Sequence, residues 1–200
     1  MARHPQYDRT AALEKAVSLF WEKGYHGSSM KQIEQALDMR PGSIYAAFGS
    51  KDGLFSEALA LYAETGSADL NDHMQQYDGI VDGFQAYLIK AAESCQNDTC
   101  PSRACMVVKT LLETRHTHDS LAIQAREALG SLEATLIGLL EQARSTGELA
   151  PDVDCERLGR LFQAQMMALR DMAEKGTKGE QLRALAEDMA GILDHYRARH

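Results

Sequence analysis

Three of the four cysteines recur at a constant five-residue interval, as Cys95, Cys100 and Cys105. The polar stretch 96–99 indicates a loop between the first two. A thiolate is a nucleophile and a redox group, and a nearby cation such as Arg103 or the start of a helix favours it. A loop of this kind can also bring two sulfurs within disulfide range. Cys105, Cys100 and Cys95 are therefore candidate residues of a thiol sensor.

Two further interpretations of the cysteines and histidines remain open. An unreactive buried cysteine is a common core residue, and Cys95 falls on an apolar helical stripe. Cysteine together with His116 and His118 could bind zinc or copper. However, no C-x2-C pair is present to match an H-x3–5-H pair. We therefore expect no metal site, and we expect the two histidines to lie in solvent at a helix end.

A second group of residues has the side chains that contact nucleic acid. The hydroxyls of Ser29, Ser43 and Tyr45 can donate hydrogen bonds to phosphate oxygens. Lys51 is expected at the start of a helix, where the helix dipole also attracts phosphate, and Arg40 has the chemistry to recognise guanine. Small side chains beside them would let the backbone approach a groove closely. The candidate DNA-binding residues are Ser29, Arg40, Pro41, Gly42, Ser43, Tyr45, Ala46 and Lys51.

Two short helices are predicted to position this second group. Ser29 and Gln32 form a capping-box pattern that starts the first helix. A three-residue connection, 38–40, separates it from a second helix that opens with Pro41. Ser50 can cap a longer helix over 51–63. Two short helices joined by a short turn are typical of a helix-turn-helix, whose second helix enters the DNA major groove.

The rest of the chain also has helical periodicity. The first helix has an apolar face from Leu13 to Trp21, with Asp8 as its cap and Gly24 just past its end. Further apolar stripes occupy 79–96, 121–143, 158–173 and 182–196, and no segment alternates as a strand would. We expect an all-α protein of about nine helices, divided into domains at 1–62 and 63–200.

The charge is distributed unevenly along the 200 residues. Apolar residues make up 44% and charged residues 25%, which is typical of a globular protein. The whole chain has a formal charge of −8, which taken alone argues against nucleic-acid binding. Residues 1–51 nevertheless hold seven Lys or Arg against five Asp or Glu. This asymmetry indicates that the two parts have different tasks.

Composition and motifs also bear on localisation and on other functions. The longest apolar run, 58–63, is far shorter than the roughly 20 residues of a membrane-spanning helix. The first residues do not resemble a signal peptide, so we expect a cytoplasmic protein with reduced cysteines and no membrane partner. A helical-bundle enzyme and a helical protein-binding adaptor remain alternatives. Against an enzyme, the sequence has no nucleophile elbow, phosphate loop or H-E-x-x-H motif.

The segment from residue 8 to about residue 60 resembles the TetR/AcrR family of bacterial transcription regulators. The residues that carry the resemblance are Gly24-Tyr25, Ser28-Ser29-Met30, Ile33, Ala36-Leu37, Gly42-Ser43-Ile44-Tyr45, Phe48, Ser50-Lys51 and Leu54-Phe55. The chain departs from the family pattern at Asp38, where glycine is usual, and at Arg40, where serine or threonine is usual. It also has Ala46 and Ala47 where larger rings are frequent.

The resemblance implies a homodimer that binds a pseudo-palindromic double-stranded operator and needs no cofactor to do so. Half-sites would lie about 34 Å, or a multiple, apart. Residues 1–62 would bind DNA, and residues 63–200 would sense a ligand and dimerise through helices at about 154–174 and 178–198. We expect a repressor that a small ligand or modification of a cysteine releases from its operator, although an activator of the same fold remains open.

The resemblance also implies an inducer, either a small molecule or an electrophile. Cys105 opens the stretch Cys-Met-Val-Val-Lys, which is similar to one at the start of helix 6 in an electrophile-sensing branch of the family. Several large apolar side chains are candidates for an inducer pocket, although at helical spacing such residues are more often plain core. They are Phe84, Tyr87, Met106, Phe162 and Met166.

Overall fold

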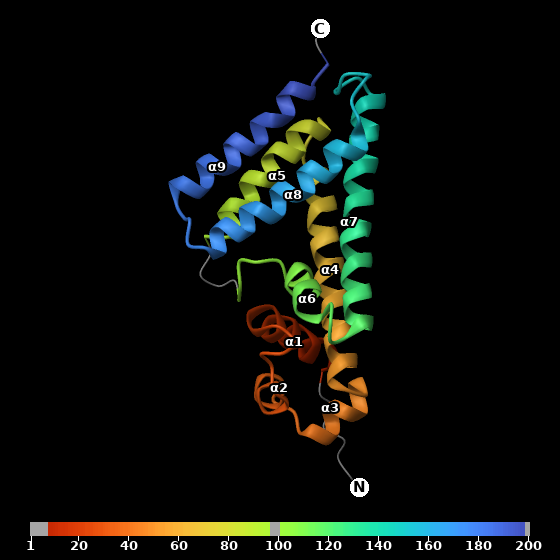
Figure 1. The fold of residues 1–200 in the computed structure, drawn as a ribbon, viewed down its shortest axis with the longest axis vertical. Coiled ribbons are helices and arrows are strands. Elements are labelled where there is room, and N and C mark those ends of the chain that lie inside the picture. Colours follow the sequence, from red (N-terminus) through yellow and green to blue (C-terminus); the bar gives the residue numbers. More distant parts are fainter. Residues whose placement is uncertain (1–7, 97–100, 199–200) are drawn as a thin grey trace. The chain divides into compact units, whose positions relative to one another are not determined.

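The computed structural model describes residues 8–96 and 101–198. These residues form nine α-helices and one 3-10 helix and no β-sheet, with one isolated antiparallel β-bridge between Leu149 and Arg197. The expected all-α fold of about nine helices is confirmed (Figure 1). The helices are α1 (Arg9–Lys23), α2 (Met30–Leu37), α3 (Pro41–Phe48), α4 (Lys51–Met74), α5 (Ile80–Ser94), α6 (Met106–Thr114), α7 (Asp119–Ser145), α8 (Cys155–Glu174), α9 (Glu180–Gly191) and the 3-10 helix η1 (Ile192–Tyr196).

The chain divides into two compact units. Unit 1 comprises Met1–Glu64 together with Met106–Arg126, and unit 2 comprises Thr65–Cys105 together with Glu127–His200. Unit 1 thus holds the predicted helix-turn-helix and, in addition, α6 and the first residues of α7.

Local signals set the start and end of α1 as expected. The Asp8 carboxylate accepts hydrogen bonds from the backbone N–H groups of Thr10 and Ala11, at 3.0 and 3.2 Å. At the other end Gly24 has a φ of +74°, and its N–H donates to the Phe20 carbonyl at 2.8 Å. Such a φ suits glycine, which has no Cβ to clash. The buried face of α1 packs inside unit 1 and includes Phe20, which lies against Phe55 of α4.

The helix-turn-helix is built from short-range caps. Ser29 and Gln32 form the expected capping box, with Ser29 N–H donating to Gln32 Oε1 at 2.8 Å. Asp38 ends α2 in the left-handed conformation, with a φ of +53°. This conformation is the one that glycine adopts most easily, which accounts for the glycine usual at this position. Pro41 opens α3 at a position where a missing N–H costs little.

The expected end of the fourth helix, at residue 63, is wrong. Helix α4 continues to Met74, through a polar stretch that includes Gly66. Polar residues and glycine locally favour the end of a helix at this stretch. The helix continues because Leu70 and Met74 are buried in the core of unit 2, and that burial stabilises its last turns. The expected domain boundary between residues 62 and 63 therefore falls inside a helix.

Unit 2 buries an apolar core between its helices. Helix α5 packs against both α8 and α9 (Figure 1). The rings of Phe84 and Phe162 lie with their centroids 4.5 Å apart. Asp154 caps α8 by accepting the Arg157 N–H at 3.0 Å. The stripe expected as one helix at 182–196 is α-helical to Gly191 and continues as the 3-10 helix η1.

Candidate nucleic-acid interface

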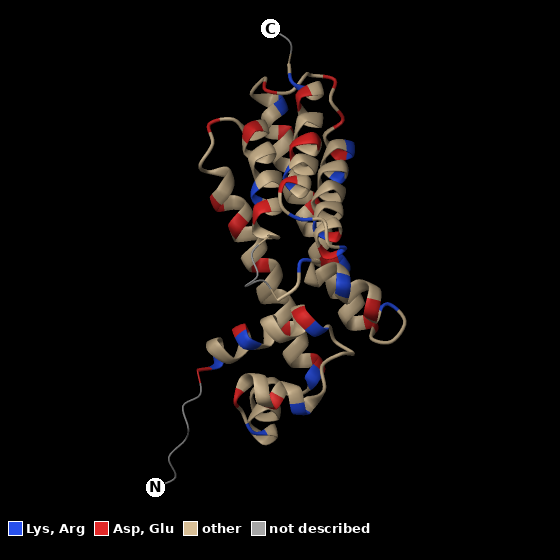
Figure 2. Ribbon diagram, turned by 90° about the vertical axis from the view of Figure 1, so that its left-hand side faces the viewer, with Lys and Arg blue, Asp and Glu red and all other residues tan. Residues whose placement is uncertain are grey.

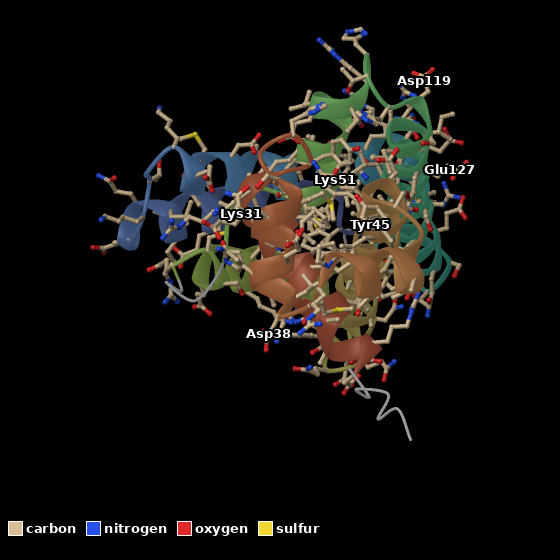
Figure 3. All side chains as sticks on the ribbon, turned by 90° about the horizontal axis from the view of Figure 1, so that it is seen from below. Lys31, Asp38, Tyr45, Lys51, Asp119 and Glu127 are labelled. Carbon is tan, nitrogen blue, oxygen red and sulfur yellow. The ribbon has the colours of Figure 1, made fainter. Side chains whose placement is uncertain are left out.

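Helix α3 has one face in the core of unit 1 and the other face in solvent. Ile44 is fully buried and Phe48 is nearly so. Tyr45, by contrast, is 49% exposed, and Gly42 and Ala46 beside it are exposed as well. Figure 3 views the structure from the side on which Tyr45 and Lys51 are labelled, with Lys31 and Asp38 nearby in the view. A hydroxyl flanked by small residues on an exposed helix can approach a nucleic-acid backbone closely.

The other predicted contact residues of α2 and α3 lie at the starts of these helices. Arg40 occupies the N-cap position of α3, and its side chain is exposed. Pro41 follows it and is exposed, whereas Ser43 is half-buried. Ser29 is exposed, but its hydroxyl already bonds the Gln32 side chain at 2.8 Å within the capping box. Their contacts with DNA therefore stay predictions, and the Arg40 side chain makes no cap hydrogen bond at the start of α3.

Lys51 lies at the start of α4 but is turned towards the protein. Its ammonium donates to the Tyr25 carbonyl oxygen at 2.6 Å and lies 4.2 Å from the centre of the Tyr25 ring. Burial lowers the pKa of Lys51, while the carboxylates of Asp52 and Glu113 act in the opposite direction. The sequence predicts a phosphate contact for Lys51, but it gives no sign of this second attachment.

Tyr25, in the turn between α1 and α2, is the centre of these contacts. Its hydroxyl donates to Asp52, and burial together with that carboxylate raises the pKa of the Tyr25 phenol. Its ring lies against Phe55, at 5.2 Å between centroids, and against His118, at 4.4 Å. The expectation that His118 lies in solvent is therefore wrong, because its ring is half-buried against Tyr25, whereas His116 is exposed as expected. Tyr25 is buried, so this turn is part of the core of unit 1 rather than a loop in solvent.

Helix α6 holds the same turn through polar side chains. Glu113 Oε2 accepts the Tyr25 N–H at 2.8 Å. One turn earlier, Lys109 Nζ donates to the carbonyl oxygens of Trp21 and Glu22, at 2.6 and 3.1 Å, which are among the last of α1. Sequence analysis missed both residues, because no local pattern links α6 to a turn more than 80 residues earlier.

The thiol segment before α6 belongs to unit 2. Cys105 is half-buried and precedes α6 by one residue, Cys95 is buried at the end of α5, and Cys100 lies outside the described residues. Glu174 Oε2 accepts the backbone N–H groups of Arg103 and Ala104, at 2.8 and 3.1 Å. The Arg103 Nε donates to the Cys95 carbonyl at 2.7 Å, so its guanidinium bonds the end of α5.

The candidate inducer-pocket residues are packed as core. Phe84, Tyr87, Phe162 and Met166 all belong to one buried cluster of unit 2, whereas Met106 lies in unit 1. Two surface pockets of the described residues are lined by other side chains. A role for these five residues in ligand binding therefore stays a prediction, and such a ligand would have to open the Phe84–Phe162 contact.

Three further observations concern metal ions, membranes and charge. Among the described residues, no group of three or more His, Cys, Asp or Glu side chains is placed to hold a metal ion. No helix within 8–96 or 101–198 combines the length and apolarity needed to cross a membrane. Figure 2 shows basic and acidic residues interspersed on the helices. The described basic residues of segment 1–51 are spread over α1, α2, the connection before α3 and the start of α4.

Comparison with known proteins agrees with this geometry. Residues 12–58 match the family "Bacterial regulatory proteins, tetR family", and residues 85–192 match "Tetracyclin repressor-like, C-terminal domain". The chain is 25% identical to the transcriptional repressor ComR of Escherichia coli, over 90% of this chain and 86% of ComR. It is 36% identical to the E. coli repressor BdcR, over 60% of this chain and 61% of BdcR.

Solved structures are similar over nearly the whole length. A TetR-family regulator from Cytophaga hutchinsonii aligns with a TM-score of 0.84 at 20% identity, covering 100% of both chains. A cysteine mutant of the regulator CifR, complexed with 26-bp double-strand operator DNA, aligns at 0.81 with 31% identity, over 95% of this chain and 98% of CifR. The matched families describe regulatory proteins and indicate no catalytic activity. With its helix-turn-helix, its helical second unit and matches to both family domains, the chain belongs to the TetR family of helix-turn-helix transcriptional regulators.

Proposed function

We propose that this protein is a transcriptional repressor that binds a pseudo-palindromic operator as a homodimer and is released by a small ligand or by modification of a cysteine. The observation that carries the DNA-binding part is α3, which buries Ile44 and Phe48 and leaves Arg40 and Tyr45 exposed. The repressor names of ComR and BdcR, and the operator complex of CifR, support the same role.

The proposed contacts divide into base recognition and backbone binding. Arg40, at the start of α3, is the candidate for a base edge, because a guanidinium matches the two acceptors of guanine. Tyr45 and Ser43 are candidates for phosphate, through their hydroxyls. Lys51 supplies a charged donor at the start of α4. Small side chains at Gly42 and Ala46 leave room for the backbone to approach.

The surface of α8 supports the homodimer. Leu161 is 37% exposed, and Ala164 and Ala168 are exposed one and two turns further along the same face. Ile192, in η1, is 38% exposed. An apolar face on a helix gains free energy when a second copy covers it, and small side chains let two helices approach closely. We therefore place the dimer contact on α8 and the α9–η1 segment, close to the expected 154–174 and 178–198.

The position of Cys105 supports release by a thiol reaction. It is half-buried, and it precedes α6 directly in the chain. Cys155 offers a matched comparison, because it is buried and burial raises the pKa of its thiol, which slows reaction. An electrophile should therefore release DNA from the wild type and from Cys155→Ser, and not from Cys105→Ser. Release from Cys105→Ser at the wild-type concentration of electrophile would exclude this thiol as the switch.

A mobility-shift experiment tests the main proposal. Reduced protein is titrated into promoter DNA from the neighbouring gene at low salt, with an unrelated duplex of equal length as competitor. We expect a complex that survives an excess of the competitor and that forms with two protomers per operator. If the protein binds the unrelated duplex as tightly as the promoter DNA, the proposal of sequence-specific binding fails.

A further inference from the structure

The backbone of Tyr25 is held from both sides by charged side chains. Its N–H donates to Glu113 of α6, at 2.8 Å, and its carbonyl oxygen accepts the Lys51 ammonium of α4, at 2.6 Å. Charge-assisted hydrogen bonds are shorter and stronger than neutral ones. Tyr25, in the turn between α1 and α2, thus connects an acid of α6 to the lysine proposed to contact phosphate.

The contact of Glu113 with this turn is close and depends on glycine. A side chain at Gly24 would collide with the Glu113 carboxylate, and the φ of +74° at Gly24 also favours glycine. Lys109 holds the end of α1 from the same helix. Helix α6 therefore holds residues 21–25 through both Lys109 and Glu113. A shift of α6 within unit 1 would change the hydrogen bond between Glu113 and the Tyr25 peptide.

We propose that Glu113 is a positioning residue for Lys51, which it fixes by way of the Tyr25 peptide so that the ammonium is preorganised for an operator phosphate. The proposal rests on the DNA-binding function proposed above and adds the route by which α6 controls it. An ammonium has three donors. The Tyr25 carbonyl takes one of them and the ring faces the group, so at least one donor remains for phosphate.

Two substitutions separate reach from charge at position 113. Glu113→Gln keeps the length of the side chain and an oxygen acceptor for the Tyr25 N–H, but it removes the charge. Glu113→Asp keeps the charge and shortens the side chain by one methylene, so the contact at 2.8 Å is lost. Each substitution is combined with Lys51→Ala in a double-mutant cycle.

Affinity is measured on the candidate operator and, separately, on an unrelated duplex at low salt, because phosphate contacts do not depend on sequence. We expect Glu113→Asp to weaken binding to both duplexes about tenfold, which corresponds to the loss of a charge-assisted contact. Glu113→Gln should stay within about twofold of the wild type, and Glu113→Asp should have no further effect when Lys51 is already alanine.

The salt dependence gives a second measure. The slope of log K against log salt is negative. Loss of Lys51 from both protomers should make it shallower by about two units, and Glu113→Asp should make it shallower by a similar amount. Equal effects of Glu113→Asp with and without Lys51, or a loss with Glu113→Gln as large as with Glu113→Asp, would overturn the proposal. Absence of a specific complex with wild-type protein contradicts the proposed function instead, and the cycle on the unrelated duplex still decides the role of Glu113.

Discussion

The α1–α2 turn of unit 1 and the core of unit 2 are stabilised by different kinds of interaction. In unit 1, the charged side chains of Lys51, Lys109 and Glu113 bond backbone groups of residues 21–25. In unit 2, a continuous apolar cluster fills the space between helices, and the Lys90–Asp69 ion pair lies at the surface. Hydrogen bonds specify direction and distance, whereas apolar burial depends mainly on the area covered.

This difference indicates what each unit tolerates. The α1–α2 turn, which is fixed by directional bonds, is expected to lose its geometry when one of the bonding side chains is shortened. An apolar cluster tolerates exchange of similar side chains provided that volume is kept. The fixed spacing of the motif residues from Gly24 to Phe55, compared with the merely helical periodicity of residues 63–200, fits this contrast.

The largest effect on stability is expected from the core of unit 2. Phe162 is fully buried and its ring contacts Phe84. We expect Phe162→Ala to lower the free energy of unfolding by about 3–5 kcal/mol, because it removes apolar burial and leaves a cavity. Ile123→Ala, at a residue that is 50% exposed, should cost well under half of that. Chemical denaturation of both variants measures the ratio, and equal losses would contradict the assigned core.

The next effect concerns recognition rather than stability. Arg40→Ala should reduce discrimination at one base pair of each half-site by about 1–3 kcal/mol. Lys51→Ala should instead weaken binding to all sequences. Binding to a library of operator variants distinguishes the two patterns. An unchanged preferred operator for Arg40→Ala would remove Arg40 from the base-contacting residues.

A smaller effect of opposite sign is expected at the end of α2. Asp38 has a φ of +53° with a non-glycine side chain. Asp38→Gly should relieve this conformation and raise the free energy of unfolding by up to about 1 kcal/mol. Gly49→Ala, at a φ of +76° with open space around the Cβ position, should lower it by a similar amount. Thermal unfolding of the two variants tests whether the signs differ.

The smallest effect is a pH dependence in unit 2. Hydrogen bonds from Arg197 and Gln85 lower the pKa of Asp194 below its ordinary value of 3.8. A carboxylate with a lowered folded-state pKa stabilises the protein above that ordinary value, and the contribution is lost as the pH falls through the folded-state pKa. Asp194 is exposed, so Asp194→Asn should lower the free energy of unfolding by well under about 1 kcal/mol at neutral pH. The free energy of unfolding of the wild type and of Asp194→Asn is measured at pH 3 and at pH 7. A difference between the two proteins that is the same at both pH values would contradict this assignment.

The sequence predicted those parts of the fold that depend on neighbouring residues. Asp8 and Gly24 delimit α1, and Ser29 with Gln32 starts α2, because each of these contacts joins residues a few positions apart. The end of α4 was predicted wrongly, since a polar stretch near Gly66 stays helical when Leu70 is buried by residues from other helices.

The candidate site follows the same rule. The exposed side of α3 could be predicted from its spacing, since Ile44 and Phe48 lie one turn apart on the opposite side. The attachment of Lys51 to Tyr25 joins residues 26 positions apart, and that of Glu113 to Tyr25 joins residues 88 positions apart. Contacts at such separations depend on how helices are packed, and no periodicity within one helix encodes them.

Unit 1 is assembled from two separate stretches of chain, up to Glu64 and from Met106 to Arg126. During synthesis the three DNA-binding helices leave the ribosome well before Lys109 and Glu113 exist. Translation at roughly 5–20 residues per second leaves this unit incomplete for several seconds. The α1–α2 turn is therefore not fixed until α6 has been synthesised. A nascent chain that is arrested near residue 64 should be cleaved by proteases more readily than the same residues in the finished protein.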